Sequence, residues 1–337
     1  MKHKVAIAGN MVVDILYKID KYPNPGELAV MEEEIEKALG GAGCNNTLDF
    51  AKLDSKLIVM PIGRVGNDEN GNYIIETFKQ YKNIDTKLVK QDGTTSFTAV
   101  MNDKTSKQRT FFQFKGANAY FSPSDIEFSE LDEVKIFHIG YLLLLDEFDK
   151  SDDIYGTKMA KVLSQLQSKG IETSIDVVSC SKGKFKEIVT PSLKYTDYCV
   201  INEFEAEQIT DIQLRKGNDL INDNIKLALI KLKNLGVGKW AVIHAPEIVY
   251  GIDCRTDEIV KMDCLKLPDH FIKGTTGAGD ALCTGILYGA YKNKTLNEAI
   301  KYGIASAVAS LSEINAYDGI KPIDDVVNLY ETLKNND

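Results

Sequence analysis

The sequence predicts an α/β fold, a doubly wound and mostly parallel sheet covered by helices on both faces. Short runs rich in β-branched or aromatic residues alternate with segments of helical period, and no long linker interrupts this alternation. Strands separated by helices of this length form right-handed crossovers, which produce parallel strands buried on both faces. The expected strands are residues 5–8, 57–60, 135–138, 173–178, 198–201 and 240–244.

The clearest helical segments lie between the later strands. Apolar side chains in residues 159–166 share one helical face, and Gly170 supplies a stop. Residues 221–232 show the same period and are followed by Gly236. Both segments are therefore predicted to be helices that cover the sheet.

Two regions, residues 15–38 and 95–114, break the alternation because they look extended but are too polar for buried strands. Residues 97–102 and 109–114 flank a polar turn and are typical of a β-hairpin. We expect both regions to form a small second sheet that closes over a site as a lid. The alternative is a plain edge hairpin or a homodimer contact through this sheet.

The whole chain, residues 1–337, is expected to be one functional unit. Its net charge of −9 argues against nucleic acid as a partner, which would call for a basic patch. No apolar stretch approaches the roughly 20 residues that a membrane helix needs, so no membrane partner is expected. Met1–Lys4 leads straight into the first strand without a signal-peptide cleavage region, and we expect a cytoplasmic protein. The cysteines form no CxxC pair, which favours reduced thiols over a zinc site or disulfides.

The strongest functional signal is the segment that ends in Gly277-Ala278-Gly279 and continues with Asp280 into a helix. The unpaired amides and positive dipole end of such a helix attract an anion, and small residues allow its close approach. A carboxylate at an anion site is unfavourable unless it has a chemical task. The expected task of Asp280 is to take a proton from a hydroxyl that attacks a phosphate.

Polar residues also follow the first predicted strand and a later glycine-rich loop. Asn10 and Asp14 belong to the first segment, and Gly41, Gly43 and Asn45 belong to the second. Loops at the carboxyl ends of parallel strands build the binding crevice, so these residues are expected to face one cleft. Asp and Asn suit sugar hydroxyls, although each loop alone also fits ordinary turn chemistry.

Asn202 and Glu205 follow the predicted strand 198–201 and open a helix. Helix capping and dipole complementarity explain both residues without any ligand. The functional alternative is that they hold the water shell of a magnesium ion, which takes only one or two carboxylates. Neither GxxxxGK[ST] nor a strand-borne GxGxxG is present, which argues against a Walker-type kinase and a nicotinamide-dependent reductase.

Residues 40–45, 202–205 and 275–280 occur in an order and at a spacing that resemble the PfkB (ribokinase-like) family of carbohydrate kinases. The resemblance extends from Val5 to about Ile320, and residues 275–280 are its most specific part. It implies a ribokinase-like fold and an enzyme that uses ATP and Mg²⁺. The expected reaction is transfer of the γ-phosphate of ATP to a hydroxyl of a small carbohydrate.

The resemblance also implies roles for individual residues. Asp280 would be the catalytic base, and the backbone of Gly277, Ala278 and Gly279 would form the anion hole. The residues implied at the nucleotide and its magnesium are Asn202, Glu205, Thr275, Gly277 and Gly279, with Glu205 reaching the metal through water. The residues expected at the substrate are Asn10, Asp14, Gly41, Asn45, Arg109 and Asn118.

Four positions depart from the family pattern. Gly274 stands where many relatives carry an acid that supports a monovalent-cation site, which argues against such a cation here. Ala42 replaces a frequent Lys that contacts the sugar, and Ile304 replaces a frequent Asn. We therefore expect adenine to be held mainly by apolar contact. His244 is either a base-stacking residue or an ordinary histidine at a strand end.

The substrate is left open between several classes. A sugar phosphate would need a basic cluster in the lid, where Lys107, Arg109 and Lys115 are the candidates, so an unphosphorylated sugar is favoured. A nucleoside is the alternative, because the phenylalanines of the hairpin could stack on a base. Those residues are Phe97, Phe112 and Phe114. A non-catalytic sugar- or nucleotide-binding protein would more naturally have lost Asp280.

Overall fold

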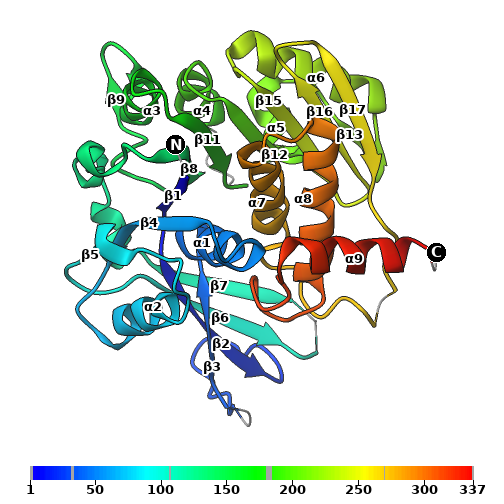
Figure 1. The fold of residues 1–337 in the computed structure, drawn as a ribbon. Coiled ribbons are helices and arrows are strands. Elements are labelled where there is room, and N and C mark those ends of the chain that lie inside the picture. Colours follow the sequence, from blue (N-terminus) through cyan, green and yellow to red (C-terminus); the bar gives the residue numbers. More distant parts are fainter. Residues whose placement is uncertain (1–2, 32–33, 106–107, 180–183, 269, 336–337) are drawn as a thin grey trace.

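The computed structural model describes residues 3–31, 34–105, 108–179, 184–268 and 270–335, and the side chain of Arg109 lies outside this description. The central sheet is nine-stranded (Figure 1). Its strands, in spatial order, are β17 (Glu258–Asp263), β16 (Ile248–Asp253), β15 (Trp240–Ala245), β12 (Tyr198–Asn202), β11 (Glu172–Val177), β8 (Val134–Leu142), β1 (Lys4–Gly9), β4 (Ile58–Val65) and β5 (Val89–Gln91).

All six predicted strands lie in the parallel part of this sheet. Three strands of the main sheet were not predicted from the sequence. β5 adds a short parallel strand at one edge, and β16 and β17 add an antiparallel pair at the other. These edge strands lack the strand–helix alternation on which the prediction depended. The predicted mostly parallel, doubly wound sheet is confirmed.

Helices cover both faces of the sheet (Figure 1). One face packs against α3 (Lys158–Ser168), α4 (Phe185–Leu193), α5 (Glu203–Thr210) and α6 (Asn222–Leu235). The other packs against α1 (Ala42–Leu53), α7 (Ala278–Tyr291), α8 (Leu296–Leu311) and α9 (Ile323–Lys334). The helices predicted at 159–166 and 221–232 are α3 and α6.

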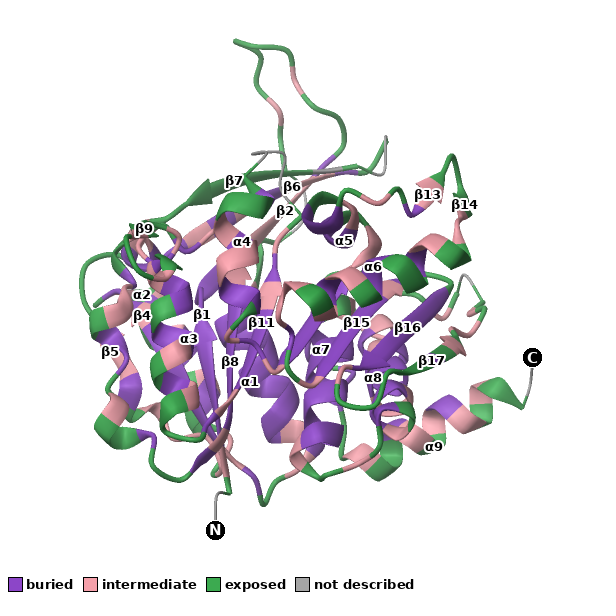
Figure 2. Ribbon diagram, turned by 90° about the horizontal axis from the view of Figure 1, so that it is seen from above, coloured by how far each residue is buried: buried purple, intermediate pink, exposed green. Residues whose placement is uncertain are grey.

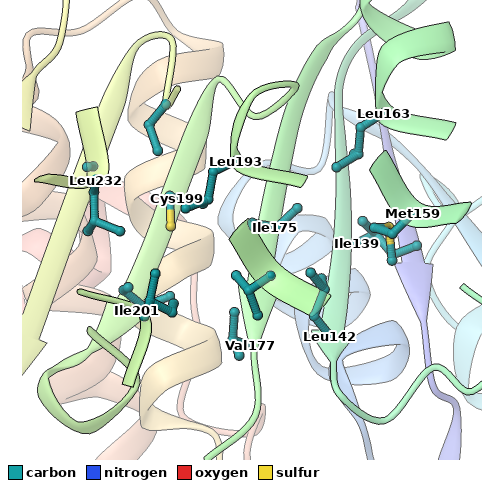
Figure 3. Close-up of a cluster of buried hydrophobic side chains, with 14 of the residues drawn as sticks. Ile139, Leu142, Met159, Leu163, Ile175, Val177, Leu193, Cys199, Ile201 and Leu232 are labelled. Atoms are coloured by element: carbon teal, nitrogen blue, oxygen red, sulfur yellow. The ribbon is translucent and has the colours of Figure 1, made fainter. Parts of the chain in front are cut away.

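Alternate side chains of β1 belong to the two hydrophobic cores on opposite faces of the sheet. Ala6 and Ala8 belong to the cluster under α3–α6, whereas Val5 and Ile7 belong to the cluster under α1 and α7–α9. Figure 3 shows part of the first cluster, in which Leu163 of α3 packs above the sheet. Figure 2 shows central strands buried between helices whose outward faces are exposed. Burying one such leucine contributes roughly 1.5–3 kcal/mol, so these contacts stabilise the packing of the helices on the sheet.

A separate four-stranded sheet lies beside the main one (Figure 1). Its order is β3 (Glu36–Gly40), β2 (Val12–Ile19), β6 (Phe97–Asp103) and β7 (Arg109–Phe114). The register of β6 and β7 joins Phe97 to Phe114 and Asn102 to Arg109, as expected for the predicted hairpin. The small second sheet is therefore confirmed, and its closure as a lid stays a prediction. α2 (Glu69–Lys79) packs against it through Ile74 and Phe78.

The remaining elements are short. They are β9 (Ser151–Asp152), β10 (Gly156–Thr157), β13 (Arg215–Lys216), β14 (Asp219–Leu220) and the 3₁₀ helices at Thr86–Leu88, Gly116–Tyr120, Pro123–Asp125 and Phe128–Glu130. Within the described ranges, the helices are all too short or too polar to span a bilayer. Cys44, Cys199, Cys254, Cys264 and Cys283 are free thiols, and Cys180 lies outside the described residues. The cytoplasmic location stays a prediction.

Candidate active site

The start of α7 is shaped by a glycine that no other residue can replace without strain. Gly277 caps the helix at φ 84°, in the left-handed region that favours glycine. A Cβ atom there would lie 2.2 Å from the Cβ of Ala316, so the close approach of residues 277 and 316 also requires glycine. The first amides of α7 have no intrahelical partner and present the positive end of the helix dipole. This geometry makes the predicted anion site physically reasonable.

Asp280 lies in the first turn of α7 and is almost completely buried, with 5% of its surface exposed. Asn45 donates from Nδ2 to Asp280 Oδ2 at 2.8 Å. The Tyr141 hydroxyl lies 2.6 Å from Oδ1 and 2.7 Å from Oδ2. Burial raises the pKa of Asp280, while the hydrogen bonds from Tyr141 and Asn45 work in the opposite direction. The carboxylate is thus held from α1 and from β8.

Tyr141 was missed from the sequence. It lies near the carboxyl end of β8, on the edge where a parallel sheet places its ligands. A hydroxyl-bearing side chain at that edge was the available signal, but the apolar run around it looked like plain strand. Burial and the nearby charge of Asp280 raise the pKa of Tyr141 well above its usual value, so its hydroxyl stays protonated.

Two further side chains of α1, Asn46 and Asp49, lie near the start of α7. Asn46 donates from Nδ2 to the backbone oxygen of Asp280 at 3.1 Å and to Thr284 Oγ1 at 2.9 Å. Asp49, also on this helix, is fully buried, and neither of its carboxyl oxygens has a partner among the described residues. Burial, and then the charge of Asp280, raise the pKa of Asp49 well above its usual value. Burial therefore favours the neutral form of the Asp49 carboxyl.

Glu205 and Asn202 form a complete capping box at the start of α5. Glu205 N donates to Asn202 Oδ1 at 2.9 Å, and Asn202 N donates to Glu205 Oε2 at 3.0 Å. Glu205 Oε1 accepts from Asn202 Nδ2 and from Ser179 Oγ, both at 2.8 Å. Burial raises the pKa of Glu205 to about 7. The predicted cap is confirmed, and a metal role is not required to explain it.

Glu205 and Asp280 nevertheless line one cavity of about 260 Å³, which we call the acid cavity. Asp176, at the carboxyl end of β11, lines it too, and burial together with the charges of Glu205 and Asp280 raises its pKa well above the usual value. Among the described residues no three His, Cys, Asp or Glu side chains lie close enough to hold a metal by themselves. Glu205 and Asp176 in the wall of the acid cavity are a donor set of the kind that Mg²⁺ takes, since this ion keeps several waters and needs only one or two carboxylates.

A larger cavity of about 560 Å³, the apolar cavity, adjoins the acid cavity at Asn202, His244 and Gly279. Thr275 and Ala278 also line it, and its wall is mainly apolar. The apolar wall includes Phe204, Leu265, Ile272, Leu282, Ile304 and Val308. The position of Ile304 in this wall agrees with the expectation that a base would be held by apolar contact.

His244 lies between the two cavities and not within the apolar wall alone. A Cβ on Gly279 would lie 3.8 Å from His244 Cε1, so the ring is beside the start of α7. Burial lowers the pKa of His244 to about 4, and the ring is therefore neutral at neutral pH. Base stacking by His244 stays a prediction, as does the alternative of an ordinary histidine at a strand end.

A third cavity of about 270 Å³, the sheet cavity, lies between the small sheet and residues 313–318. Asp14 and Thr276 line it. Asp14 is paired in register with Thr98, and burial raises the pKa of its carboxyl. Thr276 lines the sheet cavity and the next residue, Gly277, lines the acid cavity, so the two cavities have adjacent residues of the chain in their walls at the start of α7. The structure thus brings Asp14 and Asp280 to neighbouring cavities.

The register of the small sheet corrects one expectation about the phenylalanines. Phe111 is paired with Val100 and lines the sheet cavity. Phe97, Phe112 and Phe114 occupy the alternate positions of these strands, whose side chains point to the opposite face of the sheet. They therefore do not stack on a substrate in the sheet cavity, and Phe111 is the aromatic residue that faces it.

The other predicted substrate residues, Asn118, Asn10 and Gly41, are not among the residues that line the three cavities. Asn118 clamps Met11, accepting from its backbone N at 3.2 Å and donating to its backbone oxygen at 3.0 Å. Asn10 is buried, and its Oδ1 has no partner in the described part of the chain. A Cβ on Gly41 would lie 2.3 Å from the backbone oxygen of Asn10, so Gly41 serves close packing. Contacts of these residues with a substrate stay predictions.

The basic candidates of the hairpin give no visible anion site. Lys115 is paired with Asp146. Lys107 and the side chain of Arg109 lie outside the described residues, so the predicted contact of Arg109 with the substrate is untested. Two departures from the family pattern have a steric basis. A Cβ on Gly274 would lie 2.6 Å from the backbone oxygen of Ile314, and Ala42 is fully buried.

The fold and site agree with comparisons to known proteins. The chain matches the model of the pfkB family carbohydrate kinases over residues 2–323 and belongs to this family. Ribokinase of Lactococcus lactis subsp. lactis is 22% identical, covering 99% of both chains. Probable fructokinase-7 of Arabidopsis thaliana is 24% identical and covers 98% of this chain and 93% of its own. The structure of Arabidopsis thaliana ribokinase complexed with ribose and ATP has a TM-score of 0.80 at 20% identity, covering 98% of this chain and 99% of that one, which confirms the ribokinase-like fold.

Proposed function

We propose that the protein is an ATP-dependent kinase that transfers the γ-phosphate of ATP to a hydroxyl of a small, uncharged carbohydrate. One observation carries the proposal. The carboxylate of Asp280 lies in the first turn of α7 and lines the same cavity as Asn202 and Glu205. A proton acceptor, a helix N-terminus and a buried acid for a metal are the parts that phosphoryl transfer needs.

The proposed mechanism is direct, in-line transfer. The substrate hydroxyl donates its proton to Asp280 while its oxygen bonds to the γ-phosphorus, and the bond from phosphorus to the β-phosphate oxygen breaks to release ADP. The amides at Gly277, Ala278 and Gly279 stabilise charge on the transferring oxygens. Magnesium, when bound, neutralises charge on the ATP phosphates. Glu205 and Asn202 would hold it, with Glu205 acting through water.

The apolar cavity is the proposed site for adenine, and Thr275 in its wall would contact the phosphates. The sheet cavity is the proposed site for the carbohydrate, because Asp14 lines it and because Thr276 in its wall directly precedes Gly277 in the wall of the acid cavity. Closure of the small sheet over this cavity would exclude water from the reaction.

The charges of the sheet cavity favour an uncharged substrate over a sugar phosphate. Four carboxylates and one lysine line it in the described part of the chain. They are Asp14, Glu36, Glu313, Asp318 and Lys37. Although Glu36 pairs with Lys18 and Glu313 with Lys273, this surplus of acids disfavours a second phosphate group.

A nucleoside is the second candidate substrate, and the apolar part of the sheet cavity favours it. Leu16, Val100 and Phe111 line this part. A base could lie against Phe111 while the ribose lies beside Asp14. We also propose a homodimer through the small sheet, because the outward-facing Phe112 and Phe114 are 54% and 45% exposed.

The decisive experiment is ATP-dependent phosphorylation of a panel of sugars, sugar phosphates and nucleosides by the wild type and by Asp280→Asn. We expect the variant to fold and to bind ATP, and to lose roughly 10²–10⁴ in turnover because the base is gone. Wild-type turnover by Asp280→Asn would remove the base from the mechanism. Turnover of a sugar phosphate in preference to its unphosphorylated sugar would overturn the proposed substrate class.

A further inference from the structure

The hydroxyl of Tyr141 occupies the oxygens of Asp280 at which a substrate would have to arrive. It lies 2.6 Å from Oδ1 and 2.7 Å from Oδ2. Oδ2 also accepts from Asn45 Nδ2, whereas Oδ1 has no partner other than Tyr141 among the described residues. Oδ1 is therefore the oxygen left for an incoming hydroxyl, and Tyr141 already donates to it.

A general base acts only on a proton within hydrogen-bond reach, about 2.6–3.2 Å between heavy atoms. The Tyr141 hydroxyl fills this distance on Oδ1 without being able to give up its proton, because burial beside Asp280 raises the pKa of Tyr141 well above its usual value. Tyr141 is thus a permanent donor that Asp280 cannot consume. Any reacting hydroxyl has to share or displace it.

Water is the competitor that this contact would exclude. Tyr141 and Asp280 both line the acid cavity, where ATP phosphates would lie beside the start of α7. A water molecule on Oδ1 would pass a proton to Asp280 as its oxygen bonded to the γ-phosphorus. The products would be ADP and inorganic phosphate in place of ADP and a phosphorylated substrate.

We propose that Tyr141 is a positioning residue that keeps Oδ1 of Asp280 occupied until a substrate hydroxyl takes its place, and so suppresses ATP hydrolysis. This inference rests on the proposed kinase function. A carbohydrate or nucleoside bound in the sheet cavity is held by many other contacts, so its hydroxyl can displace the Tyr141 hydroxyl from Oδ1 of Asp280. A single water brings none of those contacts and competes poorly.

The test is the rate of ADP and phosphate release from ATP and Mg²⁺ without any acceptor, for the wild type, Tyr141→Phe and Tyr141→Leu. Loss of a hydrogen bond to a charged group is expected to raise this rate by about tenfold or more in both variants. Tyr141→Phe combined with Asp280→Asn should return to the background rate, because the water would no longer have a base.

Tyr198→Phe is the matched control. The Tyr198 hydroxyl is also bonded to a carboxylate, Glu172 Oε2 at 2.7 Å, and lies at the start of β12, away from the acid cavity. Its removal should change the melting temperature as much as Tyr141→Phe does, and leave hydrolysis unchanged.

The pH dependence of kinase activity distinguishes a positioning role of Tyr141 from a purely structural one. The Tyr141 hydrogen bond lowers the pKa of Asp280, so its loss should shift the acid limb of kinase activity to higher pH. Unchanged or reduced hydrolysis in the folded Tyr141 variants would overturn the inference, as would failure of both to fold, which would make Tyr141 a structural residue. When one of these contrary results is obtained and the wild type still phosphorylates a panel substrate, only the inference about Tyr141 is overturned. When the wild type phosphorylates no panel substrate, the proposed kinase function is overturned.

Discussion

Asn45 and Asp280 are 235 residues apart in the sequence and are joined by a hydrogen bond of 2.8 Å from Nδ2 to Oδ2. This bond fixes the direction of the proposed base from a helix that starts beside the small sheet. It also favours the charged form of Asp280 against the effect of burial.

Asn45→Ala should therefore lower kcat/KM by about tenfold or more, since one donor to a charged group is removed. The acid limb of the pH profile should move to higher pH, because the pKa of Asp280 rises when that donor is lost. Initial rates at several pH values measure both effects. Asn224→Ala removes an amide on the surface of α6 and should leave the profile unchanged. A loss of rate with an unshifted acid limb would contradict the role assigned to Asn45.

Glu205→Gln should raise the Mg²⁺ concentration needed for half-maximal rate by about tenfold or more, because second-sphere partners of a metal typically contribute this much. The pKa of Glu205 is about 7. Glu205 therefore loses its proton as pH rises through 7. The Mg²⁺ concentration that the wild type needs for half-maximal rate should fall from pH 6 to pH 8. Glu187→Gln on the exposed surface of α4 is the control. Equal Mg²⁺ dependence of the variant and wild type at all pH values would exclude Glu205 from metal binding.

Asp49→Asn should stabilise the protein, and increasingly so as pH rises. The folded-state pKa of Asp49 lies above its unfolded value of about 3.8, so the folded state binds more protons and the wild type loses stability as pH rises from 4 toward that folded-state pKa. Asparagine imitates the neutral acid and has no such loss. Thermal unfolding at pH 4, 6 and 8 measures the difference between the two melting temperatures. A difference that does not grow with pH would show that Asp49 is ionised or solvated in the fold.

Gly277→Ala should destabilise the fold and abolish most activity, because the new Cβ would meet the Cβ of Ala316 at 2.2 Å. Left-handed backbone alone costs roughly 1–2 kcal/mol for a non-glycine residue. Gly217→Ala separates the two causes, since Gly217 has φ 61° and no atom within 4 Å of the added Cβ. Chemical denaturation should show a larger loss for residue 277 than for residue 217. Equal losses would mean that the contact with Ala316 relaxes freely.

Much of the fold was predictable because its signals are local. The parallel strands, the cap formed by Asn202 and the hairpin from Phe97 to Phe114 each follow from residues within one short segment. Tyr141 and Asp49 were not predictable in this way. Their environments depend on the approach of β8, α1 and α7, which no single segment encodes.

The directions of individual side chains in the small sheet were also not predictable from the sequence. The hairpin was expected, but the face of each phenylalanine follows from the pairing of β6 with β2, which joins segments more than 80 residues apart. A one-residue change of register would have exchanged Phe111 for Phe112 at the cavity. Asn118 was expected at the substrate, and its role as a clamp on Met11 depends on a contact across 107 residues.

The short passage from β1 to β2 has a mechanical consequence. Asn10 and Met11 are the entire connection between β1 of the main sheet and β2 of the small sheet, and Asn118 binds both backbone groups of Met11. Asn10 in turn accepts from Gly43 N at 3.0 Å, within the first turn of the helix that carries Asn45. A connection this short leaves little room for independent movement of its two ends. A displacement of the small sheet by a bound molecule would therefore be transmitted through Asn10 and Met11 to α1, whose Asn45 orients the carboxylate of Asp280.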